Sequence, residues 1–258
     1  MEVVAALASD VGRWRQINED SGYVGESMWV VADGMGGHAA GDVASTMALE
    51  VVQTLDQRGG ISIADLHEVV AEASRAIRAY GSQHPDAAGL GTTIAGLAAI
   101  DVDGPRWAVF NVGDSRVYRL LGGRLERATV DHTEVEQFVQ AGVISADEAR
   151  RHPGRNVITQ SLGSEPPPRT DVWVLPVTAG ERFLVCSDGL TGELSDDAIR
   201  EVLTAADDPQ EAVDTLVRLA VEAGGHDNVT ALVVDPTRAE EDDDDSEPTI
   251  IRRGPWTS

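Results

Sequence analysis

The sequence has 258 residues, with 44 acidic against 20 basic side chains and a formal net charge of −24. This excess of negative charge excludes nucleic acid and anionic membrane surfaces as partners, because both attract positive potential. The single cysteine, Cys186, excludes an internal disulfide and a cysteine-ligated zinc site, which fits a cytoplasmic protein. No stretch approaches the roughly 20 apolar residues of a membrane-spanning helix.

The apolar pattern predicts strands and helices that come in separate runs. In the first half we expect a strand over 3–8, a polar loop over 12–20, a strand over 28–32, helices over 42–55 and 62–80, and strands over 92–100, 107–112 and 117–121. In the second half we expect a polar excursion over 131–162 with two short helices, strands over 172–175 and 182–187, helices over 195–204 and 209–223, and a strand over 229–234. This order favours an α+β fold of antiparallel sheets covered by helices over a doubly wound parallel sheet.

The composition changes at Arg238, where a run of acidic residues begins. Such a run cannot bury apolar area, so we expect a domain over 1–237 and an acidic disordered tail over 238–258. The alternative is a regulatory or docking segment, with Thr249 as a phosphorylation site.

Four apolar runs end at an acidic residue beside a glycine or at a strand end: Asp33, Asp114, Asp188 and Asp227. A carboxylate at the mouth of a core is costly unless a cation meets it. Hard divalent cations bind carboxylate, carbonyl and water oxygens. Taken singly, each acid is typical of a turn or a helix cap. Together they predict carboxylates that converge on divalent cations, and the carbonyl of Gly34 can face the same ions.

Six motifs follow one another in a fixed order, namely Asn18–Asp20, Ala32–His38, Gly91–Thr93, Asn111–Arg116, Ser187–Thr191 and Asp227–Thr230. Together they resemble the metal-dependent serine/threonine protein phosphatases, the PPM or type 2C family, in their bacterial form. The resemblance covers roughly residues 3 to 235. It implies a four-layer α-β-β-α sandwich of two antiparallel sheets flanked by helices, with a metal site at one edge.

The resemblance also implies a role for each matched residue. Asp33 would bridge two metal ions, Asp188 and Asp227 would complete the first, and the Gly34 carbonyl would join the second. Glu19 and Asp20 would hold metal-bound waters, and Asp114 with Asp188 would form a weaker third site. Arg15 would bind the phosphate of the substrate, although Arg13 would share its strand face. The implied cofactors are two Mn²⁺ or Mg²⁺ ions, or three with the third site occupied.

The implied reaction is hydrolysis of phosphoserine and phosphothreonine by direct attack of a metal-bridging water. The implied partners are phosphorylated proteins, including Ser/Thr protein kinases, and we expect a monomer. The segment 131–163 would form a flap that contacts the substrate, and Gln160 stands there where arginine is expected. Met35 follows the Asp33–Gly34 pair where animal relatives have histidine, so we expect His38 to be structural. We expect Cys186, Thr92 and Thr93 to be buried in the core.

Three other functions are open to test. A haloacid-dehalogenase-type phosphotransferase is suggested by Asp101-Val102-Asp103, but that chemistry uses a lysine and the chain has none. A P-loop nucleotide hydrolase is suggested by glycines near Gly34, but no Gly-Lys-Ser/Thr is present. A catalytically silent phosphatase-like binding module would need a broken set of metal ligands, whereas all the matched acids are present.

Overall fold

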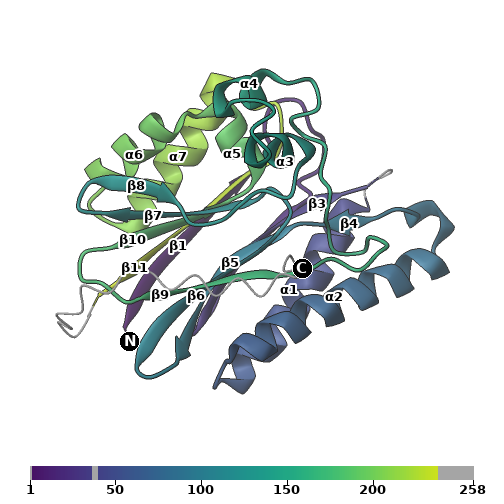
Figure 1. The fold of residues 1–258 in the computed structure, drawn as a ribbon, viewed down its shortest axis with the longest axis horizontal. Coiled ribbons are helices and arrows are strands. Elements are labelled where there is room, and N and C mark those ends of the chain that lie inside the picture. The colour runs from purple at the N-terminus through teal and green to yellow at the C-terminus, as the bar shows by residue number, and fades with distance from the viewer. Residues whose placement is uncertain (1, 37–39, 238–258) are drawn as a thin grey trace.

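The computed structural model describes residues 2–36 and 40–237 as two antiparallel sheets packed face to face, with helices on both outer faces (Figure 1). The expected tail over 238–258 and His38 lie outside the described residues. No helix in the described ranges is long and apolar enough to cross a membrane.

One sheet combines strands from the first, middle and last parts of the described residues. Its strands lie in the order β1 (Val3–Asp10), β11 (Val229–Pro236), β10 (Arg182–Cys186), β7 (Arg116–Leu121) and β8 (Arg124–Arg127). The other sheet has the order β2 (Asp20–Val24), β3 (Met28–Met35), β5 (Ile94–Asp101), β6 (Pro105–Val112) and β9 (Asp171–Pro176), with β4 (Gly91–Thr92) paired to the end of β3. Every pairing is antiparallel.

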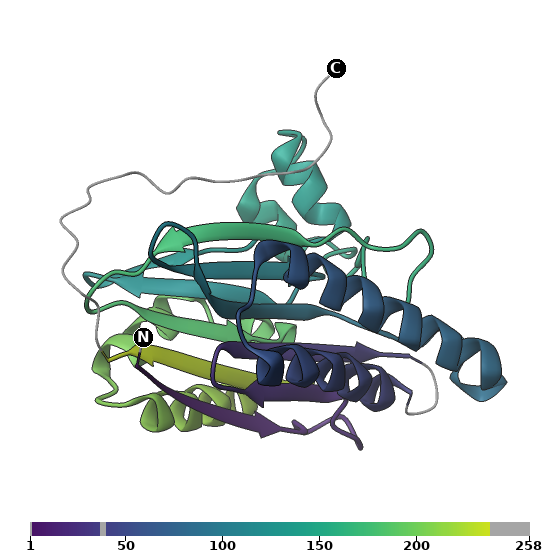
Figure 2. The ribbon, with the colours of Figure 1, turned by 90° about the horizontal axis from the view of Figure 1, so that it is seen from below.

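The helices fall into three groups. α1 (Gly41–Arg58) and α2 (Ile63–Gln83) cover the outer face of the β2–β9 sheet, and the short 3₁₀ helix η1 (Pro85–Ala87) follows them (Figures 1 and 2). The outer face of the other sheet packs against α6 (Asp196–Ala205) and α7 (Pro209–Ala223), with α5 (Asp188–Glu193) at the end of β10. α3 (Glu134–Gln140) and α4 (Ala146–Arg151) lie together at one edge, within the predicted flap.

Alternation along the strands produces three apolar layers. In β3, Val30 packs toward α1 and α2, whereas Trp29 and Val31 pack between the two sheets. In β10, Leu184 packs toward α6 and α7, and Val185 packs between the sheets. Successive side chains of a strand point to opposite faces, so strands buried on both faces must be apolar throughout. The predicted α-β-β-α sandwich is therefore confirmed.

The structure also contains elements that the apolar pattern did not predict. β2 was missed because Asp20-Ser21-Gly22 is polar and flexible. A Cβ at Gly22 would lie only 2.5 Å from a methyl carbon of Leu7 in β1. The strand therefore depends on close packing against β1, which needs glycine at this position. β3 continues past the expected end at Ala32 to Met35 because Asp33 pairs with Asp20 and Gly34 with Thr92. α5 was also missed, since it is a six-residue helix without an apolar repeat.

The segment 101–104 is the turn of the β5–β6 hairpin. The Asp101 carboxylate accepts a hydrogen bond from the Gly104 amide at 3.2 Å, and Asp103 takes a positive φ of 53°. Its acids therefore serve a tight turn, which explains their spacing without phosphotransferase chemistry.

We predict that the layer between the sheets carries much of the stability. Leu97 is fully buried there, and Leu97→Ala should lower the free energy of unfolding by about 2–5 kcal/mol, because a cavity replaces the lost side chain. Val102 in the hairpin turn is 41% exposed, and Val102→Ala should change the free energy of unfolding by less than about 0.5 kcal/mol. Urea unfolding of both variants measures the difference; equal effects would contradict the assignment of this layer.

Candidate functional site

Two carboxylates face each other across β2 and β3 at one edge of the sandwich. Asp20 is the register partner of Asp33, and directly paired residues of antiparallel strands point to the same face. Asp33 comes two residues after Val31, which packs between the sheets, so Asp33 and Asp20 point to the same side. Both acids therefore stand where the layer between the sheets reaches its edge.

The second sheet brings further acids to the same edge. Asp188 follows β10 and begins α5, and Asp227 comes two residues before β11, the strand paired with β10. The two sheets are tied together here by Ser187, whose hydroxyl donates to the Asp20 carboxylate at 2.7 Å and accepts from the Thr230 amide at 3.0 Å. The structure thus gathers acids from distant parts of the sequence.

The gathered carboxylates raise one another's pKa. Desolvation by the surrounding protein raises the pKa of Asp33 well above its usual range, and the charges of Asp20, Asp188, Asp114 and Asp227 raise it further. Desolvation is also the main reason why the pKa of Asp20 rises to about 7 and that of Asp114 to about 8. The pKa of Asp188 is raised by desolvation and then by Asp227. A site with this excess of negative charge calls for cations.

The donors at this edge fit hard divalent cations. Among the described residues, buried oxygens without a hydrogen-bond partner include Oδ1 of Asp20 and Oδ1 of Asp114. Asp33, Asp188 and Asp227 keep part of their surface exposed, so an ion and water can reach them. Within the described ranges no three His, Cys, Asp or Glu side chains form a group that could hold a metal as placed. Two of the acids nevertheless approach each other, because the side chains of Asp33 and Asp188 lie within hydrogen-bond reach.

Gly34 lies where no larger residue fits. A Cβ at this position would lie 2.1 Å from the Gly41 carbonyl oxygen and 2.5 Å from that of Glu19. The Gly34 amide donates to the Glu19 carbonyl at 3.1 Å, and Oε1 of Glu19 accepts from the Gly41 amide at 3.1 Å. Glu19 therefore contacts the first residue of α1 and the backbone beside Asp33, close to the other acids.

Thr92 and Thr93 are fully buried as expected, and they also fix the backbone of Asp33. The Thr92 hydroxyl donates to the Asp33 carbonyl at 2.9 Å, and the Thr93 hydroxyl accepts from the Asp33 amide at 3.0 Å. The Thr93 hydroxyl also shares a 2.7 Å hydrogen bond with that of Ser115, next to Asp114. These contacts connect the backbone of Asp33 to the side chain of Ser115, the residue that follows Asp114.

Arg15 contacts one of the acids directly. Its Nη2 donates to Oδ2 of Asp227 at 2.8 Å, and its side chain stays 49% exposed. This hydrogen bond is the main reason why the pKa of Arg15 is raised. The Arg13 amide instead donates to the Gly225 carbonyl at 2.7 Å. Arg15 thus places a half-exposed guanidinium beside the carboxylates.

Asn228 fixes the loop that carries Arg15, a role that the sequence motif alone did not reveal. Its side-chain amide donates to the carbonyls of Val11 and Ile17, both at 3.0 Å, and its oxygen accepts from the Glu19 amide at 2.8 Å. One buried side chain therefore positions the loop from Val11 to Glu19.

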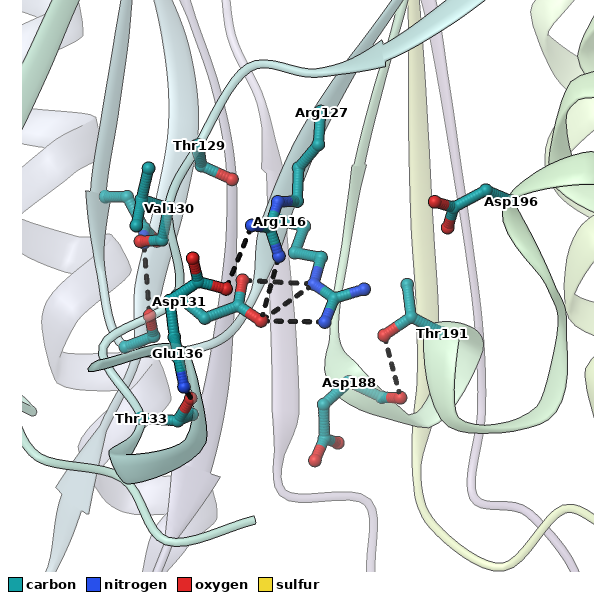
Figure 3. Close-up of polar contacts among 12 residues, drawn as sticks. Arg116, Arg127, Thr129, Val130, Asp131, Thr133, Glu136, Asp188, Thr191 and Asp196 are labelled. Atoms are coloured by element: carbon teal, nitrogen blue, oxygen red, sulfur yellow. Dashed lines mark hydrogen bonds and ion pairs between the residues drawn. The ribbon is translucent and has the colours of Figure 1, made fainter. Parts of the chain in front are cut away.

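The predicted flap is attached beside Asp114. Arg116 donates to both oxygens of Asp131 at 2.7–3.1 Å, and Arg127 bridges Asp131 and Glu136 (Figure 3). The His132 ring accepts from the amide of Gly113, the residue before Asp114, at 3.1 Å. Sequence reasoning missed these anchors, because charged residues in a polar excursion do not reveal their partners.

Two expectations concern single residues near the site. Cys186 is fully buried in the layer under α6 and α7, which confirms it as a core residue. Within the flap region, the Gln160 side chain accepts from the Arg169 amide at 2.9 Å, so in this chain it contacts the backbone that leads to β9.

The comparisons with known proteins point to one family. The family described as protein phosphatase 2C matches residues 16–220. The serine/threonine protein phosphatase PstP of Mycobacterium tuberculosis is 41% identical over 233 residues, which are 89% of this chain and 44% of that protein. The chain therefore spans less than half the length of this relative. The serine/threonine phosphatase stp of Listeria monocytogenes is 35% identical over 90% of this chain and 95% of its own.

Solved structures of the same kind share the fold. The catalytic domain of PstP in complex with two manganese ions superposes with a TM-score of 0.80 at 38% identity, over 90% of this chain and 97% of that one. The serine/threonine phosphatase Stp1 of Staphylococcus aureus gives a TM-score of 0.83 at 28% identity, over 91% and 95% of the two chains.

We predict that Asp33 destabilises the protein when metal is removed. At pH 8 in EDTA, folding is costly for Asp33 in either protonation state. It must keep its charge beside other carboxylates, or it must take up a proton that it does not carry in the unfolded chain. Asparagine has neither cost, because it is uncharged. Asp33→Asn should therefore raise the free energy of unfolding by on the order of 1 kcal/mol. Urea unfolding in EDTA tests this, with exposed Asp197→Asn as the control. A variant less stable than wild type would show that the site holds no unfavourable charge.

Proposed function

Because the chain belongs to the protein phosphatase 2C family, we propose that it is a metal-dependent phosphatase that hydrolyses phosphoserine and phosphothreonine in proteins. The observation that carries the proposal is the cluster of mutually repelling carboxylates at one sheet edge, with the half-exposed Arg15 guanidinium beside it. We assign the activity to one domain over 1–237, with the acidic segment 238–258 outside it.

Two Mn²⁺ or Mg²⁺ ions are the proposed cofactors. Asp33 would contact both, Asp188 and Asp227 would complete the first site, and the Gly34 carbonyl would serve the second. Asp114 with Asp188 would serve a weaker third site. The support is the all-oxygen donor set, which such ions prefer, and the PstP catalytic domain, whose structure contains two manganese ions. When bound, such ions supply a water of lowered pKa and neutralise phosphoryl oxygens.

The chain's own residues would bind and orient the substrate. Arg15 presents a planar fork of N–H donors that matches two phosphate oxygens, and its pairing with Asp227 aims it at the acids. Asp20, held by Ser187, and Glu19, held by the Gly41 amide, would accept hydrogen bonds from waters at the site. Asn228 would hold the backbone of the loop that carries Arg15 and Glu19 in place. Water would attack phosphorus directly, and no side chain would be phosphorylated.

The proposed substrates are proteins that carry phosphoserine or phosphothreonine, including the activation segments of Ser/Thr protein kinases. The flap over 131–163 would contribute to their binding, because its base is attached beside Asp114. We propose that the enzyme acts as a monomer.

We predict metal-dependent hydrolysis of p-nitrophenyl phosphate. Activity with Mn²⁺ should disappear in EDTA and return when Mn²⁺ is added in excess. Asp33→Asn and Asp227→Asn should each lower kcat by roughly 10²–10³-fold or more, the scale of losing one preorganised group at a developing charge. Asp197→Asn, whose side chain is 88% exposed on the first turn of α6, should keep wild-type kcat.

Direct binding of Mn²⁺, measured by isothermal titration calorimetry, separates loss of metal from loss of fold in these variants. Hydrolysis that survives EDTA, or wild-type kcat in Asp33→Asn, would remove the proposed function.

We also predict that Arg15 binds phosphate. A charge-assisted hydrogen bond contributes about 1.5–3 kcal/mol, so Arg15→Ala should lower kcat/KM by roughly 10–100-fold. The inhibition constant for inorganic phosphate should rise by a similar factor. Arg15→Lys should recover only part of the loss, because an ammonium lacks the planar fork. Arg13→Ala is the matched control from the same loop. An equal loss of kcat/KM in Arg13→Ala would contradict the assignment of phosphate binding to Arg15.

A further inference from the structure

Trp14 is exposed in an unusual way for so large an apolar side chain. It is 70% exposed, the largest fraction among the large hydrophobic side chains in the described ranges. An indole that stays in water forgoes the free energy that burial of its apolar surface would bring. Its position in the loop that carries Arg15 suggests that a ligand covers it.

The indole is nevertheless held in place on one side. It stacks on the His226 ring with a centroid distance of 5.6 Å and an angle of 11° between the planes. The carboxylate of Glu193 accepts from the His226 amide at 3.1 Å and lies 2.6 Å from Nδ1 of its ring. One face of the indole therefore stacks on a ring that Glu193 holds, and the rest of its surface stays open to solvent.

The two loops involved approach each other closely. A Cβ at Gly12 would lie 2.2 Å from the Asp227 carbonyl oxygen, and a Cβ at Gly225 would lie 3.2 Å from the Arg13 amide nitrogen. Both glycines also have positive φ, 77° and 58°, which larger residues rarely adopt. The contact between the loops thus places Trp14 on His226 and, one residue along in each loop, Arg15 on Asp227.

We propose that the outer face of Trp14 binds a basic side chain that flanks the phosphorylated residue of the substrate protein. This inference rests on the proposed function, because it takes Arg15 as the contact for the phosphate. Trp14 and Arg15 are consecutive residues, and they contact the consecutive residues His226 and Asp227, so the same pair of loops would carry the phosphate contact and the contact for the flanking side chain. Trp14 is then a determinant of sequence specificity in this phosphatase.

A cation is the occupant that fits the charge around the indole. Tryptophan is the best aromatic partner for arginine or lysine through cation–π attraction. Behind the indole, the stack ends in the carboxylate of Glu193. Two arginines flank Trp14 in the sequence, and of these Arg15 is already paired with Asp227; a bound phosphomonoester adds about −1.5 to −2 charge. The net charge of −24 also disfavours acidic segments.

Phosphothreonine peptides that differ only at the flanking positions test the proposal. Each peptide carries Arg, Leu or Glu on either side of phosphothreonine, and its kcat/KM is divided by that for p-nitrophenyl phosphate. With wild type, the Arg peptides should exceed both the Glu and the Leu peptides, by roughly three- to thirtyfold for Glu. In Trp14→Ala this preference should shrink to within about twofold, and Trp14→Phe should retain part of it.

The control is Val102→Ala, which removes another exposed apolar side chain, in the β5–β6 turn. It should keep the wild-type preference. The proposal is overturned if Trp14→Ala keeps the full preference for Arg, or if wild type prefers Leu to Arg. If the wild-type protein does not hydrolyse p-nitrophenyl phosphate, the proposed function itself is rejected. Failure of the Trp14 proposal and failure of the proposed function are therefore distinguishable.

Discussion

Repulsion between carboxylates at one edge of the sandwich is the constraint on which the rest of the site depends. Asp33, Asp20, Asp114 and Asp188 all have raised pKa values because protein atoms and one another's charges surround them. A fold tolerates such a cluster only if its other interactions hold the backbone in place. The three continuous apolar layers provide this stability, and the hydrogen bonds of buried hydroxyls fix the individual strands.

The site exists only because the two sheets pack together. Asp20 belongs to one sheet, whereas its hydrogen-bond donor Ser187 comes from the end of β10 in the other. Asn228, just before β11, accepts from Glu19, just before β2. Neither sheet alone would gather the acids or orient Arg15. Packing between the sheets therefore contributes to function directly, since a shift of one sheet against the other would separate the carboxylates.

The sequence allowed prediction of the layers, because apolar runs mark buried strands, and it singled out the acids that the structure brings together. The strand ends were less accurate, since β3 continues past Asp33 to Met35 and Asp227 comes before β11. The sequence did not predict β2, since Asp20-Ser21-Gly22 forms a strand only through pairing with β3 and contact with Leu7. It did not reveal what Asn228 or Arg116 holds, because their partners are fixed by tertiary packing. Local patterns encode burial and period, whereas polar partners far apart in the chain depend on the complete fold.

The same two loops position the residue proposed to bind phosphate and the residue proposed to bind the flanking side chain. Arg15 on Asp227 and Trp14 on His226 are successive contacts between the same two loops. The loops can approach this closely because Gly12 and Gly225 have no side chains. Both contacts use side chains at the surface, whereas the carboxylates are fixed from behind by the sheets. A change at Trp14 can therefore alter which substrate sequences bind while the positions of Asp33 and Asp188 stay the same.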